Sequence, residues 1–161
     1  MSKIKYKITL NLILIFSIFS LVAAYFIQYF LDHQPCNLCL LERIPYVSVI
    51  IIISLCLFLK KFEKFSLVAL SLIFFIATLL SFYHFGIEQG FIEESLVCNV
   101  SNKDKVFTAE ELLKKLREQP ISCKDVTFRL LGISLATINT IVSLALSVIT
   151  LRAYLNYEKN K

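Results

Sequence analysis

Thr9 to Leu31 reads TLNLILIFSIFSLVAAYFIQYFL, an apolar run of 23 residues that contains no charged side chain. A helix needs about 20 apolar residues to cross roughly 30 Å of hydrocarbon. The run therefore predicts a membrane-spanning helix. It continues well past Ala24, further than the apolar core of a cleavable signal peptide, so we expect this helix to be retained.

Three more apolar runs follow, from Pro45 to Leu59, from Phe65 to Phe85 and from Leu130 to Leu151. The first of these three reaches membrane-spanning length only if its helix begins near Leu40. Hydrophobic residues make up 57% of the chain, which excludes an ordinary soluble domain. The sequence predicts an all-α integral membrane protein, a single membrane domain over residues 1–161, with a four-transmembrane-helix bundle at about 9–31, 40–59, 65–85 and 130–151.

The basic residues predict how this bundle is oriented. They gather before the first span, between the second and third, and after the fourth, as Lys3, Lys5, Lys7, Lys60, Lys61, Lys64, Arg152, Lys159 and Lys161. These segments lie on one side of a four-span chain, and the positive-inside rule makes that side cytoplasmic. We therefore expect both termini inside and outside loops at about 32–39 and 86–129. The net charge of +5 is a topology signal rather than a nucleic-acid signal.

Four of the five cysteines fall in the expected outside loops. Cys36 and Cys39 precede the second span, and Cys98 and Cys123 lie in the long loop, where disulfides persist. Two structural disulfides are one interpretation, since closing the loop from Cys98 to Cys123 would contribute about 3 to 4 kcal/mol in the chain-entropy model. Cys56 falls within the second span and is expected to be a buried apolar thiol.

The close spacing of Cys36 and Cys39 favours exchange chemistry instead. Pro35 fits a helix start here, and a helix N-terminus lowers the pKa of a thiol and makes a bond between cysteines three apart exchangeable. A zinc site formed with the other cysteines and His84 is a third interpretation. Structural zinc sites usually need two close pairs and this chain has one, so no metal is expected.

Two polar residues near the outer membrane face could serve a ligand. Arg43 lies four residues after Cys39 and would share its helical face, where it places a cation beside the thiol, although arginines at span ends also snorkel to headgroups. His84 stands at the outer end of the third span. No glycine-rich dinucleotide loop and no haem-attachment motif is present, so a lipid-dissolved electron acceptor is favoured.

The long outside loop contains its own helix signal. Thr108 to Glu111 forms a capping box, and Leu112, Leu113 and Leu116 form an apolar stripe before Pro120. We expect a short amphipathic helix in this second outside loop. It could pack against the rest of the loop, or rest in the membrane interface and leave the segment with Cys98 free to reach a partner.

The ordered motifs resemble one family over nearly the whole chain. They are Cys36-Asn37-Leu38-Cys39-Leu40-Leu41-Glu42-Arg43 with Pro45-Tyr46, Tyr83-His84-Phe85-Gly86-Ile87-Glu88, Cys98, Cys123-Lys124-Asp125, Leu131-Gly132-Ile133-Ser134 and Asn139. This order is similar to that of the disulfide bond formation protein B (DsbB) family. The chain departs from it at Thr127-Phe128, near the start of the fourth helix, where the family often has Pro-Trp.

The resemblance implies a quinone-reducing protein-disulfide oxidoreductase of the bacterial inner membrane that reoxidises a periplasmic DsbA-like dithiol oxidase. Cys98 would form the mixed disulfide with that partner, Cys123 would pair with Cys98, and a Cys36 to Cys123 bond would arise during turnover. Cys39 would face the quinone, ubiquinone or menaquinone, with a quinone oxygen held by Arg43 and His84.

Two other functions compete with this one. A vitamin-K-epoxide-reductase-like enzyme also has four helices and a quinone, but it would require the cysteine pairs in the reverse order. A non-enzymatic four-span adaptor with structural disulfides in its outside loops is the alternative from a different class.

Overall fold

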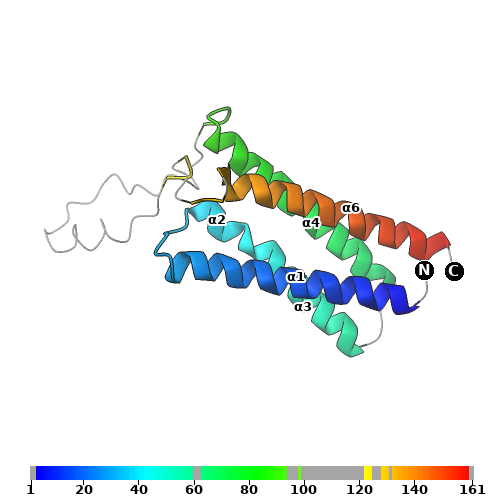
Figure 1. Ribbon diagram of the computed structural model, residues 1–161. Helices are drawn as coiled ribbons and strands as arrows, with labels where there is room; N and C mark the ends of the chain where they lie inside the picture. The colour runs from blue at the N-terminus through cyan, green and yellow to red at the C-terminus, as the bar shows by residue number, and fades with distance from the viewer. Residues whose placement is uncertain are drawn as a thin grey trace, which may run out of the picture.

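The computed structural model describes residues 3–59, 63–93, 98, 122–124, 128–130 and 132–159. The amphipathic helix expected near residues 108–119 lies outside this part of the chain. The elements are α1 (Lys3–Tyr29), α2 (Asn37–Leu41), α3 (Arg43–Leu59), α4 (Glu63–Glu88), β1 (Arg129–Leu130), β2 (Ile133–Ser134) and α6 (Leu135–Lys159). Their arrangement confirms a four-span helical bundle (Figure 1).

The second span is built from two helices. α2 and α3 together give an apolar stretch from Asn37 to Leu59 that is long enough to cross a membrane. Glu42 separates them, since it caps the C-terminus of α2 with its backbone N–H on the carbonyl of Leu38. The second span therefore begins even earlier than the expected position near Leu40, and it carries a charged residue at its break.

The fourth span begins later than the sequence suggested. A helix was expected from Leu130, but β1 and β2 pair as a small antiparallel hairpin, with Leu130 opposite Ile133. Gly132 turns this hairpin with φ of 85°, a left-handed conformation that glycine adopts without strain. The Oγ of Ser134 then accepts the backbone N–H of Thr137 at 3.2 Å, an N-terminal cap that starts α6 at Leu135.

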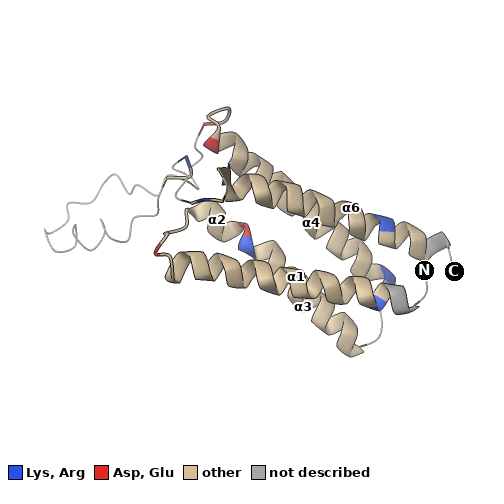
Figure 2. Cartoon of the chain, in the orientation of Figure 1, with Lys and Arg blue, Asp and Glu red and all other residues tan. Residues whose placement is uncertain are grey.

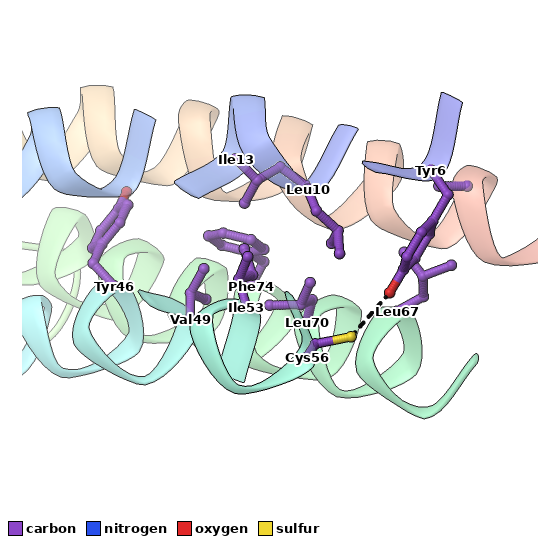
Figure 3. Close-up of a cluster of buried hydrophobic side chains, with 11 residues drawn as sticks. Tyr6, Leu10, Ile13, Tyr46, Val49, Ile53, Cys56, Leu67, Leu70 and Phe74 are labelled. Atoms are coloured by element: carbon purple, nitrogen blue, oxygen red, sulfur yellow. Dashed lines mark hydrogen bonds between the residues drawn. The ribbon is translucent and has the colours of Figure 1, made fainter. Parts of the chain in front are cut away.

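The core of the bundle lies between helices that pack in the order α1, α3, α4 and α6, with the closest packing between α4 and α6. Leu10 of α1, Ile53 of α3 and Phe74 of α4 are fully buried in one apolar cluster (Figure 3). Small polar side chains line the α4–α6 contact, where Ser147 donates a hydrogen bond to the carbonyl of Ser71. Small residues let membrane helices approach closely, which accounts for the close packing of α4 on α6.

The outside of the bundle is apolar along its length. Large side chains such as Phe19 on α1 and Phe58 on α3 are 67% and 84% exposed, as expected for lipid-facing positions. Both chain termini lie at one end, where basic side chains gather (Figure 2), and the cysteine-bearing segments lie at the opposite end. The apolar length of the bundle therefore separates the basic end from the cysteine-bearing end.

Candidate functional site

Cys36 and Cys39 are held together by the start of α2. Cys36 is the N-cap of this helix, and its Sγ accepts the backbone N–H of Cys39 at 3.3 Å. The two sulfur atoms lie 2.8 Å apart, and both cysteines are free thiols. The predicted helix start at Pro35 is confirmed, because the helix begins at Asn37. When these thiols are oxidised to a disulfide, the two sulfur atoms need to move only a short distance.

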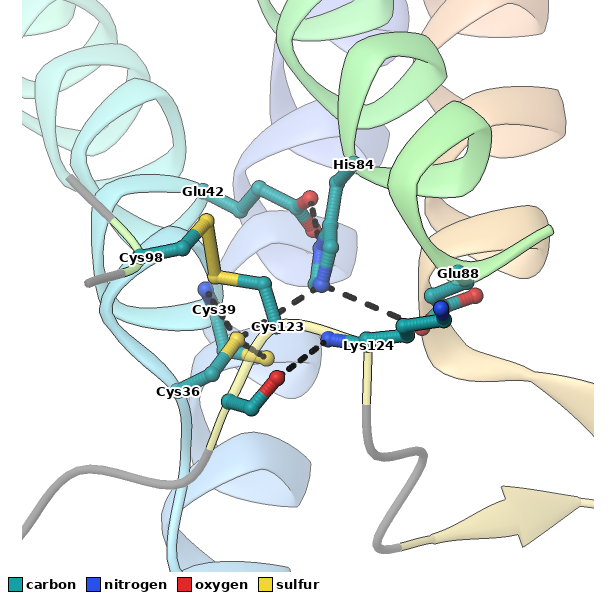
Figure 4. Close-up of a disulfide and its surroundings, with 9 residues drawn as sticks. Cys36, Cys39, Glu42, His84, Glu88, Cys98, Cys123 and Lys124 are labelled. Carbon is teal, nitrogen blue, oxygen red and sulfur yellow. Dashed lines mark hydrogen bonds and ion pairs between the residues drawn. A yellow bond between two sulfur atoms is a disulfide. The ribbon is translucent and has the colours of Figure 1, made fainter. Parts of the chain in front are cut away.

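The second cysteine pair lies beside the first. Cys98 and Cys123 form a disulfide with Cα atoms 5.6 Å apart. Their side chains share one buried cluster with Cys36 and Ile87 of α4 (Figure 4). Segments 25 residues apart in the loop thus meet at the end of the bundle, and two pairs of cysteines become neighbours in a space that excludes water.

His84 connects the first pair to the interior of the bundle. It is 2% exposed, and its Nε2 lies 3.5 Å from the Sγ of Cys36 (Figure 4). Its Nδ1 lies 2.8 Å from the Oε1 of Glu42, and a carboxylate oxygen can only accept, so Nδ1 is the donor. Nε2 is then the ring atom that can exchange a proton with the Cys36 thiol.

Glu42 is fixed in turn by a chain of hydrogen bonds across three helices. The Nδ2 of Asn139 on α6 donates to Oε2 of Glu42 at 2.7 Å, and Tyr46 of α3 donates its hydroxyl to the Oδ1 of Asn139 at 2.6 Å. Hydrogen bonds between membrane helices contribute about 0.6 kcal/mol each on average. The network is therefore suited more to fixing the His84 ring than to stabilising the fold as a whole.

The pKa of the Cys36 thiol is held well below its usual value. The largest cause is the hydrogen bond from the Cys39 thiol, and the hydrogen bond and charge of His84 act in the same direction against the opposing effect of burial. The sequence predicted Arg43 as the cation beside the Cys39 thiol. The structure places Arg43 at Gln28 and brings His84, from the third span, to the sulfur of Cys36.

Arg43 points toward α1. Its Nη1 donates to the Oε1 of Gln28 at 2.6 Å, and its guanidinium lies 4.9 Å from the ring centre of Tyr25. These residues line an open groove of about 410 Å³, together with Tyr29, Leu40, Ile44, Val47 and Ser48. The groove combines aromatic and aliphatic walls with a cation, and it begins one residue after Cys39.

The predicted site residues are thus brought together in two parts. Cys36, Cys39 and His84 meet with the Cys98–Cys123 disulfide in the buried cluster, whereas Arg43 lines the neighbouring groove. Two acidic residues escaped the sequence prediction, Glu42 beside His84 and Glu88 one turn further along α4. A charged residue inside an apolar span is the signal that could have identified Glu42, whereas Glu88 follows the predicted end of the third span.

These features define a class: a four-span membrane protein that carries two adjacent cysteine pairs, one disulfide-bonded and one free. A family model described as "Disulfide bond formation protein DsbB" matches residues 6–153. The chain therefore belongs to the DsbB family of disulfide bond formation membrane proteins. The predicted family is confirmed, and with it a role in protein-disulfide oxidoreduction.

One similar protein comes from Rickettsia prowazekii (strain Madrid E). The chain is 32% identical over 161 residues to the uncharacterized protein RP370, with 98% of this chain and 92% of the relative covered. No solved structure matches the chain. The likeness extends along the whole bundle and both cysteine-bearing loops.

Proposed function

We propose that this protein is a quinone-dependent thiol oxidase that reoxidises a periplasmic DsbA-like dithiol oxidase. Electrons pass from the Cys98–Cys123 pair to the Cys36–Cys39 pair and then to a membrane quinone, ubiquinone or menaquinone. The observation that carries the proposal is the packing of both pairs in one buried cluster. Neighbouring pairs of this kind can exchange disulfides in succession. If both disulfides were purely structural, all four cysteines would be bonded and no free pair would lie beside the Cys98–Cys123 bond.

The proposal places the cysteine-bearing end in the periplasm and both termini in the cytoplasm of a bacterial inner membrane. Basic residues at the terminal end support this orientation through the positive-inside rule. The oxidising compartment is then the one that contains the partner and the Cys98–Cys123 disulfide.

Disulfide exchange accounts for the electrons in four steps. A thiolate of the partner attacks Cys98, breaks the bond to Cys123 and releases the Cys123 thiolate. That thiolate attacks Cys36 of an oxidised Cys36–Cys39 pair, which forms a Cys36–Cys123 bond and releases the Cys39 thiolate. The second partner thiolate then attacks the partner sulfur bonded to Cys98, which forms the partner disulfide and releases the Cys98 thiolate, so two electrons have entered and the partner leaves oxidised. Attack of the Cys98 thiolate on Cys123 restores the Cys98–Cys123 bond and leaves both electrons on Cys36 and Cys39.

The groove lined by Leu40 and Arg43 is the quinone site in this proposal. Arg43 supplies a guanidinium that can donate to a carbonyl oxygen, while Tyr25, Tyr29 and Val47 offer the flat and apolar walls that a ring requires. When bound, a quinone accepts the two electrons and two protons that the thiols release. A DsbA-type oxidant has a potential near −120 mV, so an acceptor with a higher potential than thiol pools is needed.

Replacing Cys123 by serine tests the exchange order. In the wild-type protein the Cys123 thiolate can attack Cys98 and release the partner. Without Cys123 that attack is lost, so the mixed disulfide between Cys98 and the partner should accumulate. Membranes that contain the Cys123→Ser variant are mixed with the oxidised partner, whose disulfide the free Cys98 thiolate attacks, and are then quenched with acid, alkylated and run on a non-reducing gel. The Cys98→Ser, Cys123→Ser double variant is the matched control and should give no adduct. A structural staple would yield no adduct in either variant.

Replacing Arg43 by alanine tests the groove. A hydrogen bond to a charged group contributes about 1.5 to 3 kcal/mol, so the apparent quinone KM should rise about tenfold or more with little change in kcat. The Arg43→Lys variant keeps the charge but loses the planar fork and should lie between the two. Steady-state rates at varied quinone concentration measure the effect. An unchanged KM would assign Arg43 to the lipid headgroups instead.

A further inference from the structure

Three metal-ligand atoms meet at the buried cysteine pair. The Sγ atoms of Cys36 and Cys39 and a ring nitrogen of His84 lie within 4.8 Å of one another. We propose that the reduced Cys36–Cys39 pair forms, with His84, a binding site for one zinc ion that exists only while both cysteines are thiols, with Glu88 near enough to offset the charge of the ion. Two cysteines and one histidine, with water in the fourth position, are a ligand set that zinc accepts.

Glu88 provides an observation independent of the cysteines. Its side chain is 6% exposed, its Oε1 lies 3.8 Å from the Nε2 of His84, and its Oε2 has no hydrogen-bond partner within the described part of the chain. A buried carboxylate oxygen without a partner is costly. Figure 4 shows His84 between the cysteine pair and Glu88, with the side chain of Lys124 extending toward Glu88, so this carboxylate adds negative charge beside the proposed ion without being one of its ligands.

The distances are close to those of a tetrahedral zinc site. Bond lengths of about 2.3 Å to sulfur and 2.0 to 2.1 Å to nitrogen give a sulfur-to-nitrogen edge of about 3.5 Å and a sulfur-to-sulfur edge of about 3.8 Å. The Cys36 to His84 distance of 3.5 Å already fits. The Cys36 to Cys39 distance of 2.8 Å is short. A rotation of the Cys39 side chain, away from Cys36 and toward His84, supplies the remaining adjustment.

The surroundings of His84 match those of a metal-binding histidine. Its Nδ1 lies 2.8 Å from Glu42, the carboxylate contact that fixes the ring and directs Nε2 at the ion in zinc proteins. Two thiolates would neutralise the double charge of the ion, which reduces the cost of burying it. The sequence disfavoured zinc because only one close cysteine pair is present, and His84 joins that pair only through the packing of α4 on the second span.

Zinc binding at this site is controlled by oxidation. Binding displaces the two thiol protons to solvent and changes no oxidation state, whereas a Cys36–Cys39 disulfide removes both thiolate ligands. Within the proposed function, zinc would therefore compete with oxidation of the pair and hold the protein in its reduced form. The binding itself needs neither quinone nor partner, so it can be tested apart from turnover.

The test uses the full-length protein in detergent with Cys98 and Cys123 replaced by alanine, so that the close pair is the only neighbouring dithiol. Zn²⁺ is titrated against a chromophoric chelator, and Cd²⁺ is followed by its thiolate charge-transfer absorption. We expect one ion per chain in the reduced protein and none at that site after oxidation to the disulfide. This comparison requires no substitution among the three ligands.

Variants of His84 and Glu88 complete the experiment. His84→Ala and Glu88→Gln should each weaken zinc affinity about tenfold or more, while the exposed Glu93→Gln serves as a matched control without effect. The proposal is overturned if the reduced protein binds no ion, if the oxidised protein binds equally well, or if Glu88→Gln leaves the affinity unchanged. None of these results would alter the expected thiol oxidase activity, which is measured separately.

Discussion

Replacing Cys39 by serine is expected to abolish quinone reduction while leaving Cys98 and Cys123 able to form their disulfide. Cys39 is adjacent in sequence to Leu40, which lines the groove with Arg43, and its sulfur lies 2.8 Å from that of Cys36. A serine hydroxyl cannot form or release a disulfide, so electrons would have no route from Cys36 onward. Anaerobic quinone absorbance, followed with reduced partner supplied, measures the loss.

Cys56 offers a matched control for this variant. It is 9% exposed in the apolar core, and its Sγ lies 3.2 Å from the hydroxyl of Tyr6 (Figure 3). The Cys56→Ser variant should therefore reduce quinone at the normal rate. Thiol trapping of the Cys39→Ser protein should still show the Cys98–Cys123 bond. A normal rate of quinone reduction in Cys39→Ser would remove Cys39 from the proposed electron path.

The membrane fold was predictable because apolar length is a local property. Four runs of suitable length require four helices, since a spanning segment must satisfy its backbone internally. The start of the fourth helix was not predictable in the same way. The apolar residues from Leu130 onward read as helix, but Gly132 permits a left-handed turn and Ser134 caps the next residue. Hydropathy does not distinguish a short apolar hairpin from a helical turn.

The candidate site was predictable only in part, for a related reason. Cysteine spacing and charge identified the residue types, but the direction of each side chain depends on helix packing. Arg43 turns to Gln28 because α1 packs against α3. His84 reaches Glu42 because α4 packs against α3, and Asn139 approaches from α6. Contacts among three separate helices have no signature in the order of residues along the chain.

The hydrogen bonds around Cys36 and His84 should raise the reduction potential of the Cys36–Cys39 pair. A thiolate that is stabilised in the reduced form makes the corresponding disulfide a better oxidant. Cys36 is stabilised by the Cys39 thiol and by His84, which Glu42 orients. In the proposed scheme Cys36 is bonded to Cys123 during turnover, so there is no Cys36 thiolate for His84 to stabilise. The electrons then reside on Cys39, the residue before Leu40 of the groove.

Replacing His84 by alanine is accordingly expected to lower the reduction potential of the Cys36–Cys39 pair by about 30 to 60 mV. Loss of the His84 hydrogen bond and charge raises the pKa of the Cys36 thiol toward its usual value, while the Cys39 hydrogen bond remains. Each unit of pKa corresponds to about 1.4 kcal/mol, or about 30 mV for a two-electron couple. Equilibration with glutathione or dithiothreitol buffers, in protein without Cys98 and Cys123, measures the potential.

The pH dependence of that potential gives the sharper result. Above the low pKa of Cys36, reduction of the pair takes up one proton and the potential falls by about 30 mV per pH unit, while below it two protons give about 59 mV. In His84→Ala the pH of this change should move upward, because Cys36 keeps its proton to higher pH. The His33→Ala variant should behave as wild type, since His33 contacts Phe128 instead. An unchanged potential and an unchanged transition pH in His84→Ala would show that this histidine does not control the Cys36 thiolate.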